Sequence, residues 1–315
     1  WLSSISLIVW DSETNAIATF GSIFFIIFLL FTLPLIKLQS FFIILFLISL
    51  LFLVIGQLPD QGVLFDSVTT TLMFAGLIST MGLVRATGLK LNTVRKSQLR
   101  LSKLPRKLLA PGFQLTAHFF GSVINTGVFA MLAAAIPKDS SFGYRKVAAE
   151  ASLRGMASSS TWSPFFVAFV VGQIYIDNFN AWLGLAIGLV MATFFLLSLT
   201  VLSNKGNLVE NLSSSTKCLT PIIPSLIVIM LSVISAAIFF ELTALSAIIA
   251  VMPILVGLYC ALKPKEIMPI VSETIIYLKS TKDEVLVISI AMIVGLLITN
   301  DNKALSELTH LQIFD

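Results

Sequence analysis

The chain has 315 residues, of which 57% are hydrophobic and only 11% carry a charge. Soluble proteins carry about a quarter charged residues, so this composition excludes a soluble globular protein and predicts a polytopic membrane protein. The net charge of +4 does not indicate nucleic-acid binding, because twelve of the 20 lysines and arginines lie between Arg85 and Arg154, beside apolar segments. We expect contact with membrane lipid and no nucleic-acid partner.

A membrane-spanning helix needs about 20 predominantly apolar residues. Seven apolar runs meet this requirement and predict spans at about 17–36, 41–57, 62–84, 181–203, 218–240, 243–262 and 284–300. Two further apolar runs, 108–137 and 147–176, are interrupted by polar residues. The fold class that we expect is therefore an all-α polytopic membrane protein.

The stretch from Arg85 to Lys107 has eight basic residues and no acid, and it gives the clearest orientation signal in the chain. Lysine and arginine are enriched in short loops on the cytoplasmic side of a membrane. We therefore expect loop 85–107 to be cytoplasmic and the N-terminus to lie outside. The expected location is a bacterial inner (plasma) membrane.

The run 108–137 has basic residues on both sides and a polar interruption in its middle. Two basic flanks indicate that the chain enters and leaves on the same face, which predicts a re-entrant hairpin of two half-helices. Non-helical backbone at that depth must be buried in protein or line water, so the tip is a candidate binding site. One long tilted span is the alternative. The candidate residues at the tip are Ser122, Asn125, Thr126 and Gly127.

The run 147–176 contains five hydroxyl residues and a proline between Ala157 and Pro164. Proline removes a backbone donor and disrupts the preceding turn, so we predict a broken helix. Carbonyl and hydroxyl oxygens of an unwound stretch suit Na⁺, and half-helix ends suit an anion. The alternative is a proline kink whose hydroxyls bond to their own helix. The candidate residues here are Ser158, Ser159, Ser160, Thr161 and Ser163.

Two short fragments, 73–80 and 292–299, share Met, Gly, Leu and Thr in the same order. Each closes the third span of its half, and the two spans have opposite expected orientations, as in the inverted repeats of secondary transporters. We therefore expect a first repeat at 1–203, a cytoplasmic linker at 204–217 and an incomplete inverted second repeat at 218–315. On this reading the chain is truncated after Asp315. The alternative is an accidental similarity in a whole protein.

The order of spans, basic loop, hairpin and broken helix resembles the ion transporter superfamily, which includes arsenite permeases, sodium/proton antiporters of the NhaD kind and divalent-anion/sodium symporters. Hairpin tips in that family often read Ser-Asn-Thr, and Ser122-Val-Ile-Asn125-Thr126 is similar with two residues inserted. The family's broken helix often carries Gly-Thr-Pro followed by Asn, whereas Ser160-Thr161-Trp162-Ser163-Pro164 lacks the Asn, which leaves the subfamily and the ion open.

The resemblance implies that both polar interruptions bind Na⁺ or substrate. It also implies an elevator-like motion of the hairpin and the broken helix against a scaffold, in a homodimer. We expect a secondary active transporter that moves a small anion, a carboxylate or an inorganic oxyanion, coupled to Na⁺ or H⁺. Na⁺ is the one candidate ion at the site, and we expect no cofactor. The alternatives are a Na⁺/H⁺ antiporter of the same fold and a non-transporting scaffold subunit.

Other polar residues carry weaker signals. Glu150 and Arg154 stand four residues apart on an expected helix and are predicted to pair, although an unpaired Arg154 would attract anions. For His118, close to the tip, a hydrogen-bonded packing role is favoured over a proton relay. An enzyme is not expected, because His118 and His310 lie far apart and no span core holds two acids.

Overall fold

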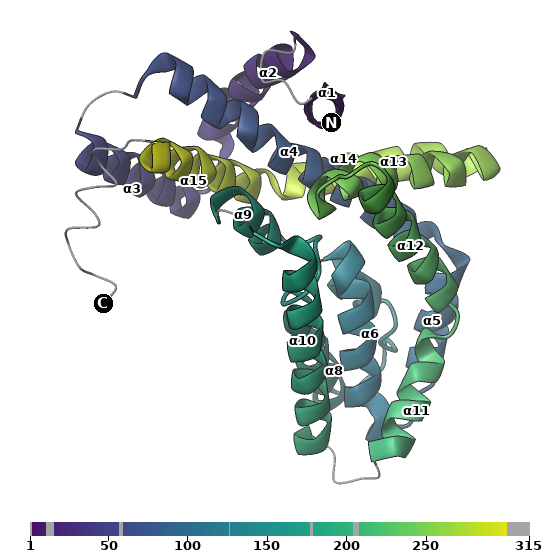
Figure 1. Cartoon of the computed structure of the whole chain (residues 1–315). Helices are drawn as coiled ribbons and strands as arrows, with labels where there is room; N and C mark the ends of the chain where they lie inside the picture. Colours follow the sequence, from purple (N-terminus) through teal and green to yellow (C-terminus); the bar gives the residue numbers. More distant parts are fainter. Residues whose placement is uncertain are drawn as a thin grey trace. The chain divides into compact units, whose positions relative to one another are not determined.

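The computed structural model describes residues 2–10, 16–56, 59–125, 127–176, 179–203 and 208–300, and these residues form helices without strands (Figure 1). The α-helices are α1 (Leu2–Trp10), α2 (Ala16–Thr32), α3 (Leu38–Ile55), α4 (Gln61–Lys90), α5 (Asn92–Ser102), α6 (Leu109–Ile124), α7 (Gly127–Ala133), α8 (Phe142–Ser159), α9 (Val167–Tyr175), α10 (Ala181–Ser203), α11 (Leu208–Leu219), α12 (Ile223–Phe239), α13 (Ala244–Leu262), α14 (Ile267–Ser280) and α15 (Lys282–Asn300). Three short 3₁₀ turns, η1 (Leu33–Leu35), η2 (Arg106–Leu108) and η3 (Pro264–Glu266), join some of them.

Six helical segments in the described residues are long and apolar enough to cross a membrane, which confirms the membrane class. They are Ala16–Leu35, Leu38–Ile55, Gln61–Lys90, Ala181–Ser198, Ala244–Leu262 and Lys282–Asn300. Each coincides with a predicted span. The seventh predicted span, 218–240, is a shorter apolar helix, α12, because its first residues belong to α11 and Pro224 is placed in the first turn of α12, where a missing N–H is tolerated.

Helix α4 is longer than the predicted span 62–84 and has 30 residues. At 1.5 Å per residue it is about 45 Å long, which exceeds the roughly 30 Å hydrocarbon thickness of a bilayer. Because α4 continues to Lys90, Arg85 and Lys90 belong to the helix, although the sequence suggested that they open a loop. The rest of that basic stretch forms α5, whose buried side chains include Val94 and Leu101.

The expected linker 204–217 is helical from Leu208 onward, where α11 begins. Serine and threonine have low helix propensity, and that composition suggested a loop. Packing of α11 against α5 and α6 compensates for this low helix propensity, since Ser215 and Cys218 are fully or almost fully buried. Arg100 Nη1 also donates to the carbonyl oxygen of Lys217 at 2.7 Å, which satisfies one carbonyl at the end of α11.

The chain divides into two compact units. Unit 1 comprises residues 1–79 and 275–315, and unit 2 comprises residues 80–274. Helix α4 runs through both, with its first part in unit 1 and its end in unit 2.

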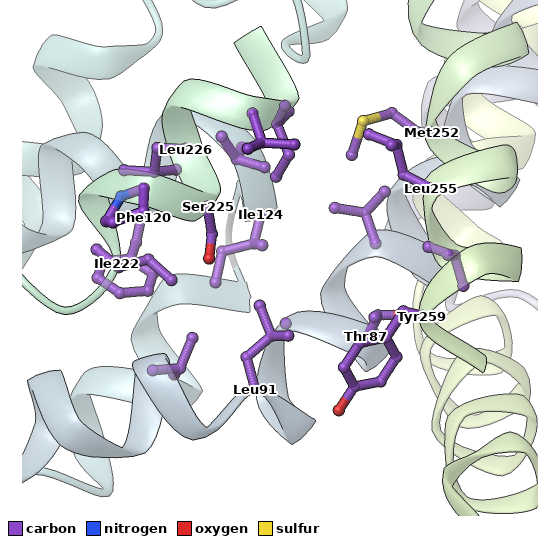
Figure 2. Close-up of a pocket in the computed structure, with 18 residues that line it drawn as sticks. Thr87, Leu91, Phe120, Ile124, Ile222, Ser225, Leu226, Met252, Leu255 and Tyr259 are labelled. Atoms are coloured by element: carbon purple, nitrogen blue, oxygen red, sulfur yellow. The ribbon is translucent and has the colours of Figure 1, made fainter. Parts of the chain in front are cut away.

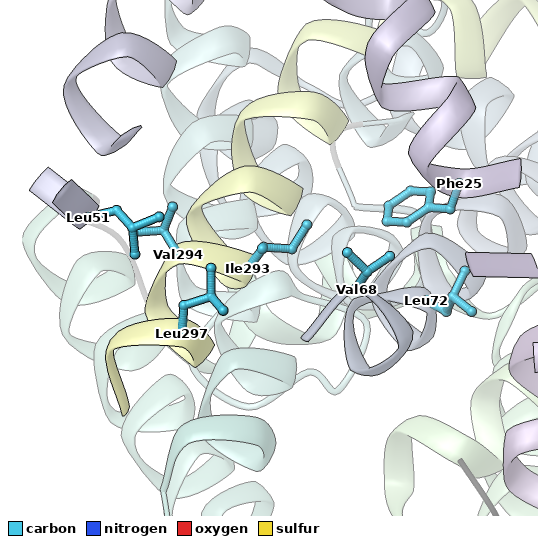
Figure 3. Close-up of a cluster of buried hydrophobic side chains, with 7 residues drawn as sticks. All are labelled: Phe25, Leu51, Val68, Leu72, Ile293, Val294 and Leu297. Atoms are coloured by element: carbon cyan, nitrogen blue, oxygen red, sulfur yellow. The ribbon is translucent and has the colours of Figure 1, made fainter. Parts of the chain in front are cut away.

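Unit 1 is held together by apolar side chains of α2, α3, α4 and α15 (Figure 3). The buried members of this cluster are Phe25, Leu51, Val68, Leu72, Ile293, Val294 and Leu297. The turn between α2 and α3 is bonded to the start of α15. Lys282 Nζ donates to the carbonyl oxygen of Leu35 at 2.6 Å, and the Lys37 N–H donates to Asp283 Oδ2 at 3.4 Å.

Unit 2 is built around α6 and α8, which make the most extensive contact between two helices of the described residues and lie beside α10 in Figure 1. The two backbones approach closely at Gly155, where an added Cβ would overlap the carbonyl oxygen of Gln114 and lie 2.8 Å from Ala117 Cβ. Only glycine fits at this crossing. A second close approach places Gly188 of α10 against the backbone of Thr161.

Candidate functional site

The tip of the predicted hairpin is the turn between α6 and α7. Helix α6 ends at Ile124, and Asn125 has φ 49° and ψ −136°, which interrupts the helical backbone before α7 begins at Gly127. Asparagine tolerates positive φ better than most residues with a side chain. The structure therefore shows two helices separated by a turn where the sequence predicted an interruption. Thr126 lies outside the described residues.

The predicted break in the second segment is also present. Helix α8 ends at Ser159 and α9 begins at Val167, so 160–166 lie outside both α-helices. Turn-type backbone bonds fill part of this stretch, among them Ser163 N to Ser159 O at 3.1 Å and Phe166 N to Ser163 O at 3.3 Å. Pro164 has no backbone N–H to continue the helical ladder.

The tip and the break contact each other directly. Ser163 Oγ donates to the backbone carbonyl oxygen of Ser122 at 2.5 Å, and the Phe165 N–H donates to Ser163 Oγ at 3.2 Å. Ser122 and Ser163 are 5% and 1% exposed, so this bond lies in the interior of unit 2. Ser163 thus joins the end of α6 to the unwound stretch after α8.

A second polar link between these elements is formed by His118, which is buried. Trp162 Nε1 donates to His118 Nε2 at 3.2 Å, and His118 Nδ1 lies 2.8 Å from Ser158 Oγ. Because an indole N–H can only donate, Nε2 must accept, and the neutral ring carries its proton on Nδ1. Ser158 Oγ accepts that proton and donates in turn to the Gly155 carbonyl oxygen at 2.7 Å.

This arrangement fits the packing role predicted for His118. Both ring nitrogens are occupied, and a proton on Nε2 would face the N–H of Trp162. The relay from Trp162 through His118 to Ser158 fixes the ring between α6 and the break.

The hydroxyl groups proposed as ligands are bonded to their own helices, as in the kinked-helix alternative. Each donates to the carbonyl oxygen three residues earlier, at 2.7–2.8 Å, and the residues are Ser122, Ser158, Ser159, Ser160 and Thr161. Thr161 Oγ1 also lies 3.2 Å from the Gly188 carbonyl oxygen. Their hydroxyl protons are therefore engaged, whereas lone pairs on the hydroxyl oxygens can still coordinate a cation.

Arg85 is a candidate residue that the sequence did not suggest. An ideal Cβ placed on Gly127 would lie 2.6 Å from Arg85 Cδ and 2.8 Å from Arg85 Nε, so the arginine side chain lies against the tip. The Nε atom is buried. A fixed positive charge beside the tip is suited to attracting an anion there. The unexpected length of α4 places Arg85 here.

Arg154 is paired, as predicted. Its Nη2 lies 3.5 Å from Glu150 Oε2, and Lys146 Nζ lies 3.9 Å from the other oxygen of the same carboxylate. The side chains of Arg154 and Glu150 are 38% and 45% exposed. Exposed pairs of this kind contribute little to stability.

Two cavities adjoin the tip and the break. One, of about 320 Å³, is lined by Ser122, Trp162 and apolar residues of α12. The other, of about 410 Å³, is lined by His118, Trp162 and residues of α10, and also by Gln114 and Ser215. Gln114 Nε2 and Ser215 Oγ are buried without a hydrogen-bond partner in the described residues. No cluster of metal-ligating side chains occurs in the parts of the chain that the structure describes.

Comparison of the chain with protein-family models, with curated proteins and with solved structures gives no match.

Replacing Ser160 with alanine tests whether the back-bonded hydroxyls contribute to stability. Because Ser160 bonds only to its own helix in the structure, we expect unfolding stability to change by less than about 0.5 kcal/mol. The matched variant Ser163→Ala removes a buried bond between segments and is expected to cost about 1–3 kcal/mol. Thermal unfolding in detergent measures both. A similar loss in both variants would contradict the distinction drawn between the two hydroxyls.

Proposed function

We propose that this protein is a secondary active transporter that moves a small anion, a carboxylate or an inorganic oxyanion, coupled to Na⁺ or H⁺. The contact between the tip and the break is the observation that carries the proposal. Two interruptions of apolar segments, separated by about 40 residues, are bonded through Ser163 and Ser122. Interrupted helices that meet within a membrane are the usual construction of transporter binding sites.

Arg85 supports the choice of an anion. Its side chain lies against Gly127 and supplies positive charge beside the unwound backbone of the tip. Hydroxyl and carbonyl oxygens of the tip and break residues are the ligand type that Na⁺ prefers among the groups present. An anion and a cation would then occupy neighbouring positions and offset each other's charge. Coupling to H⁺ would require a side chain that binds and releases a proton. In the structure both ring nitrogens of His118 are engaged in hydrogen bonds, so this histidine does not supply such a group.

The division into two units supports the elevator-like motion that the resemblance implies. The tip, the break and the relay all belong to unit 2, whereas unit 1 contains α1, α2, α3, α15, the first part of α4 and the end of α14. A transporter of this type needs a substrate-carrying part that is internally rigid. The close backbone contacts at Gly155 and Gly188 supply that rigidity within unit 2.

Flux into proteoliposomes tests the proposal. The purified protein is reconstituted, and uptake of radiolabelled succinate, citrate, phosphate and sulfate is measured under an imposed inward Na⁺ gradient, an imposed H⁺ gradient and no gradient. We expect one gradient to drive accumulation of at least one of these anions over protein-free vesicles. Na⁺ movement driven by a pH gradient without any anion would indicate the antiporter instead. Absence of all gradient-driven flux would overturn the proposal.

The variant Arg85→Gln tests the anion contact. A charged hydrogen bond contributes about 1.5–3 kcal/mol, so its loss is expected to raise the KM for the anion by about tenfold or more. Arg85→Lys keeps the charge and is expected to recover part of the affinity. Arg154→Gln is the matched control, because Arg154 pairs with Glu150 and should leave KM unchanged. Equal KM values for Arg85→Gln and the unaltered protein would remove Arg85 from the site.

A non-transporting membrane subunit is the second candidate. The observation that favours it is the engagement of the tip and break hydroxyls with their own helix carbonyls. In that case the two interruptions would serve packing alone. Variants at Ser163 or Arg85 would then change stability or partner binding, and no anion would protect the protein against thermal unfolding.

A further inference from the structure

Unit 2 contains a further cavity, separate from the two that adjoin the tip and the break, and it takes no part in the proposed transport site. It has a volume of about 370 Å³ and lies among the end of α4, the start of α5, and helices α6, α12 and α13. Figure 2 shows side chains of these helices pointing toward one another around the open space. Cavities of this size commonly hold small molecules or parts of larger ones.

The wall of this cavity is almost entirely hydrocarbon. Leu91, Phe120, Ile124, Met252 and Leu255 are typical of its lining. Such a wall offers contacts to an apolar chain.

The hydroxyl protons of two polar lining residues are already used. Thr87 donates to the Leu83 carbonyl oxygen at 2.8 Å, and Tyr259 donates to the Lys90 carbonyl oxygen at 3.3 Å. Ser225 is the third polar lining residue, so the cavity offers a polar molecule few partners within a wall of hydrocarbon.

One edge of the cavity is basic. Tyr259 lines it, and Lys263 Nζ lies 5.4 Å from the centroid of the Tyr259 ring, a cation–π contact. Lys90 is bonded to the same tyrosine through its carbonyl oxygen and directly precedes the lining residue Leu91. The Glu266 carboxylate, three residues after Lys263, acts electrostatically on the same tyrosine, so this edge also carries one acid.

Beyond Lys90 the chain continues into α5, which carries more positive charge. Its exposed side chains include Arg95, Lys96 and Arg100, and its sequence contains no acid. The hydrocarbon cavity thus has Lys263 beside its lining residue Tyr259, and its lining residue Leu91 directly follows Lys90. This combination matches an amphiphile with one apolar chain and an anionic head.

We propose that this cavity binds a membrane phospholipid with a net negative headgroup. One acyl chain occupies the space between α4, α6, α12 and α13, and the phosphate lies beside Lys90 and Lys263. The charge of the border selects the anionic lipid, whereas the hydrocarbon wall holds any acyl chain. Because Phe120, Val123 and Ile124 line the cavity, the bound chain contacts α6 in the last turns before the tip.

Native mass spectrometry of the delipidated protein in detergent tests headgroup selection. The protein is titrated with dioleoyl phosphatidylglycerol and, separately, with dioleoyl phosphatidylcholine, which differ in headgroup charge but not in chains. We expect the first phosphatidylglycerol to bind at least fivefold more tightly. The double variant Lys90→Gln/Lys263→Gln is expected to abolish this preference, and Lys265→Gln on the neighbouring exposed position is the control. Equal affinity for both lipids in the unaltered protein would overturn the proposal.

Filling the cavity tests the position of the chain. An added Cβ at Gly88 would make only ordinary contact, 3.5 Å from Ile124 Cγ2, so Gly88→Phe can extend into the space. We expect it to lose the tight lipid, while the control Gly257→Phe, at a glycine with no neighbour within 4 Å, retains it. Ser225 also lines the cavity, so Ser225→Leu is the second variant if Gly88→Phe does not fold.

Retention of phosphatidylglycerol selectivity by a folded cavity variant would place the lipid elsewhere and contradict the proposal. Binding of neither lipid by the unaltered protein would do the same, and would leave a second copy of the chain or another polypeptide as the occupant. Transport plays no part in these readouts, so they stand or fall independently of the proposed function.

Discussion

The variant Gly155→Ala is expected to lose at least about 2 kcal/mol of stability and to separate α6 from α8. The added methyl group would overlap the carbonyl oxygen of Gln114, which belongs to helix backbone and cannot rotate away. Overpacking of a well-packed interior commonly costs about 1–3 kcal/mol, and a backbone clash belongs at the upper end. The apparent melting temperature in detergent, followed by fluorescence-detected size-exclusion chromatography, measures the loss.

Gly257→Ala is the matched control for this experiment. Gly257 lies inside α13, is exposed, and has no atom within 4 Å of an added Cβ. Alanine is the better helix former by up to about 1 kcal/mol, so this variant should be neutral or slightly more stable. The same chemical change is thus expected to act in opposite directions at the two positions. If Gly155→Ala were as stable as the control, the close crossing of α6 and α8 would be wrong.

The variant His118→Leu is expected to cost about 1–3 kcal/mol and to reduce any transport. It removes the acceptor of the Trp162 N–H and leaves that part-buried donor without its partner, which carries a desolvation cost. Ser158 would keep its bond to the Gly155 carbonyl oxygen, so the damage should be confined to the link with the break. Thermal unfolding and proteoliposome flux measure the two effects.

A double-mutant cycle with Trp162→Phe separates this bond from simple packing. Phenylalanine removes the indole N–H, so His118→Leu should cost less in that background than in the unaltered protein. A coupling energy of about 0.5–3 kcal/mol is expected for residues in one hydrogen-bond network. Strictly additive losses would show that His118 and Trp162 act separately, and the tautomer assigned above would lose its basis.

Much of the helical framework follows from local sequence alone. Uninterrupted apolar runs of about 20 residues gave six spans that the structure contains, because in a membrane such runs satisfy their own backbone hydrogen bonds. The two interruptions were also predictable. Asn125 and Pro164 each carry a local conformational preference that opposes helix, and the structure has non-helical backbone at both.

Features that depend on tertiary packing were missed. The serine-rich stretch before Cys218 is a helix because its buried face packs on α5 and α6, which no local pattern reveals. Arg85 was interpreted only as a sign of orientation. Its place beside Gly127 depends on the continuation of α4 to Lys90, and the absence of proline between 85 and 90 was the available signal. The pairing of Ser163 with Ser122 likewise required the crossing at Gly155.

The bonds between the α2–α3 turn and the start of α15 bear on the order in which the chain folds during translation. Lys37 and Asp283 are separated by 246 residues, and Leu35 and Lys282 by 247. At about 5–20 residues per second, a ribosome needs tens of seconds to make the second partner after the first. All of unit 2 is synthesised within that interval. The earliest helices to emerge are therefore among the last to complete their packing, and until then their apolar faces depend on lipid or on the insertion machinery.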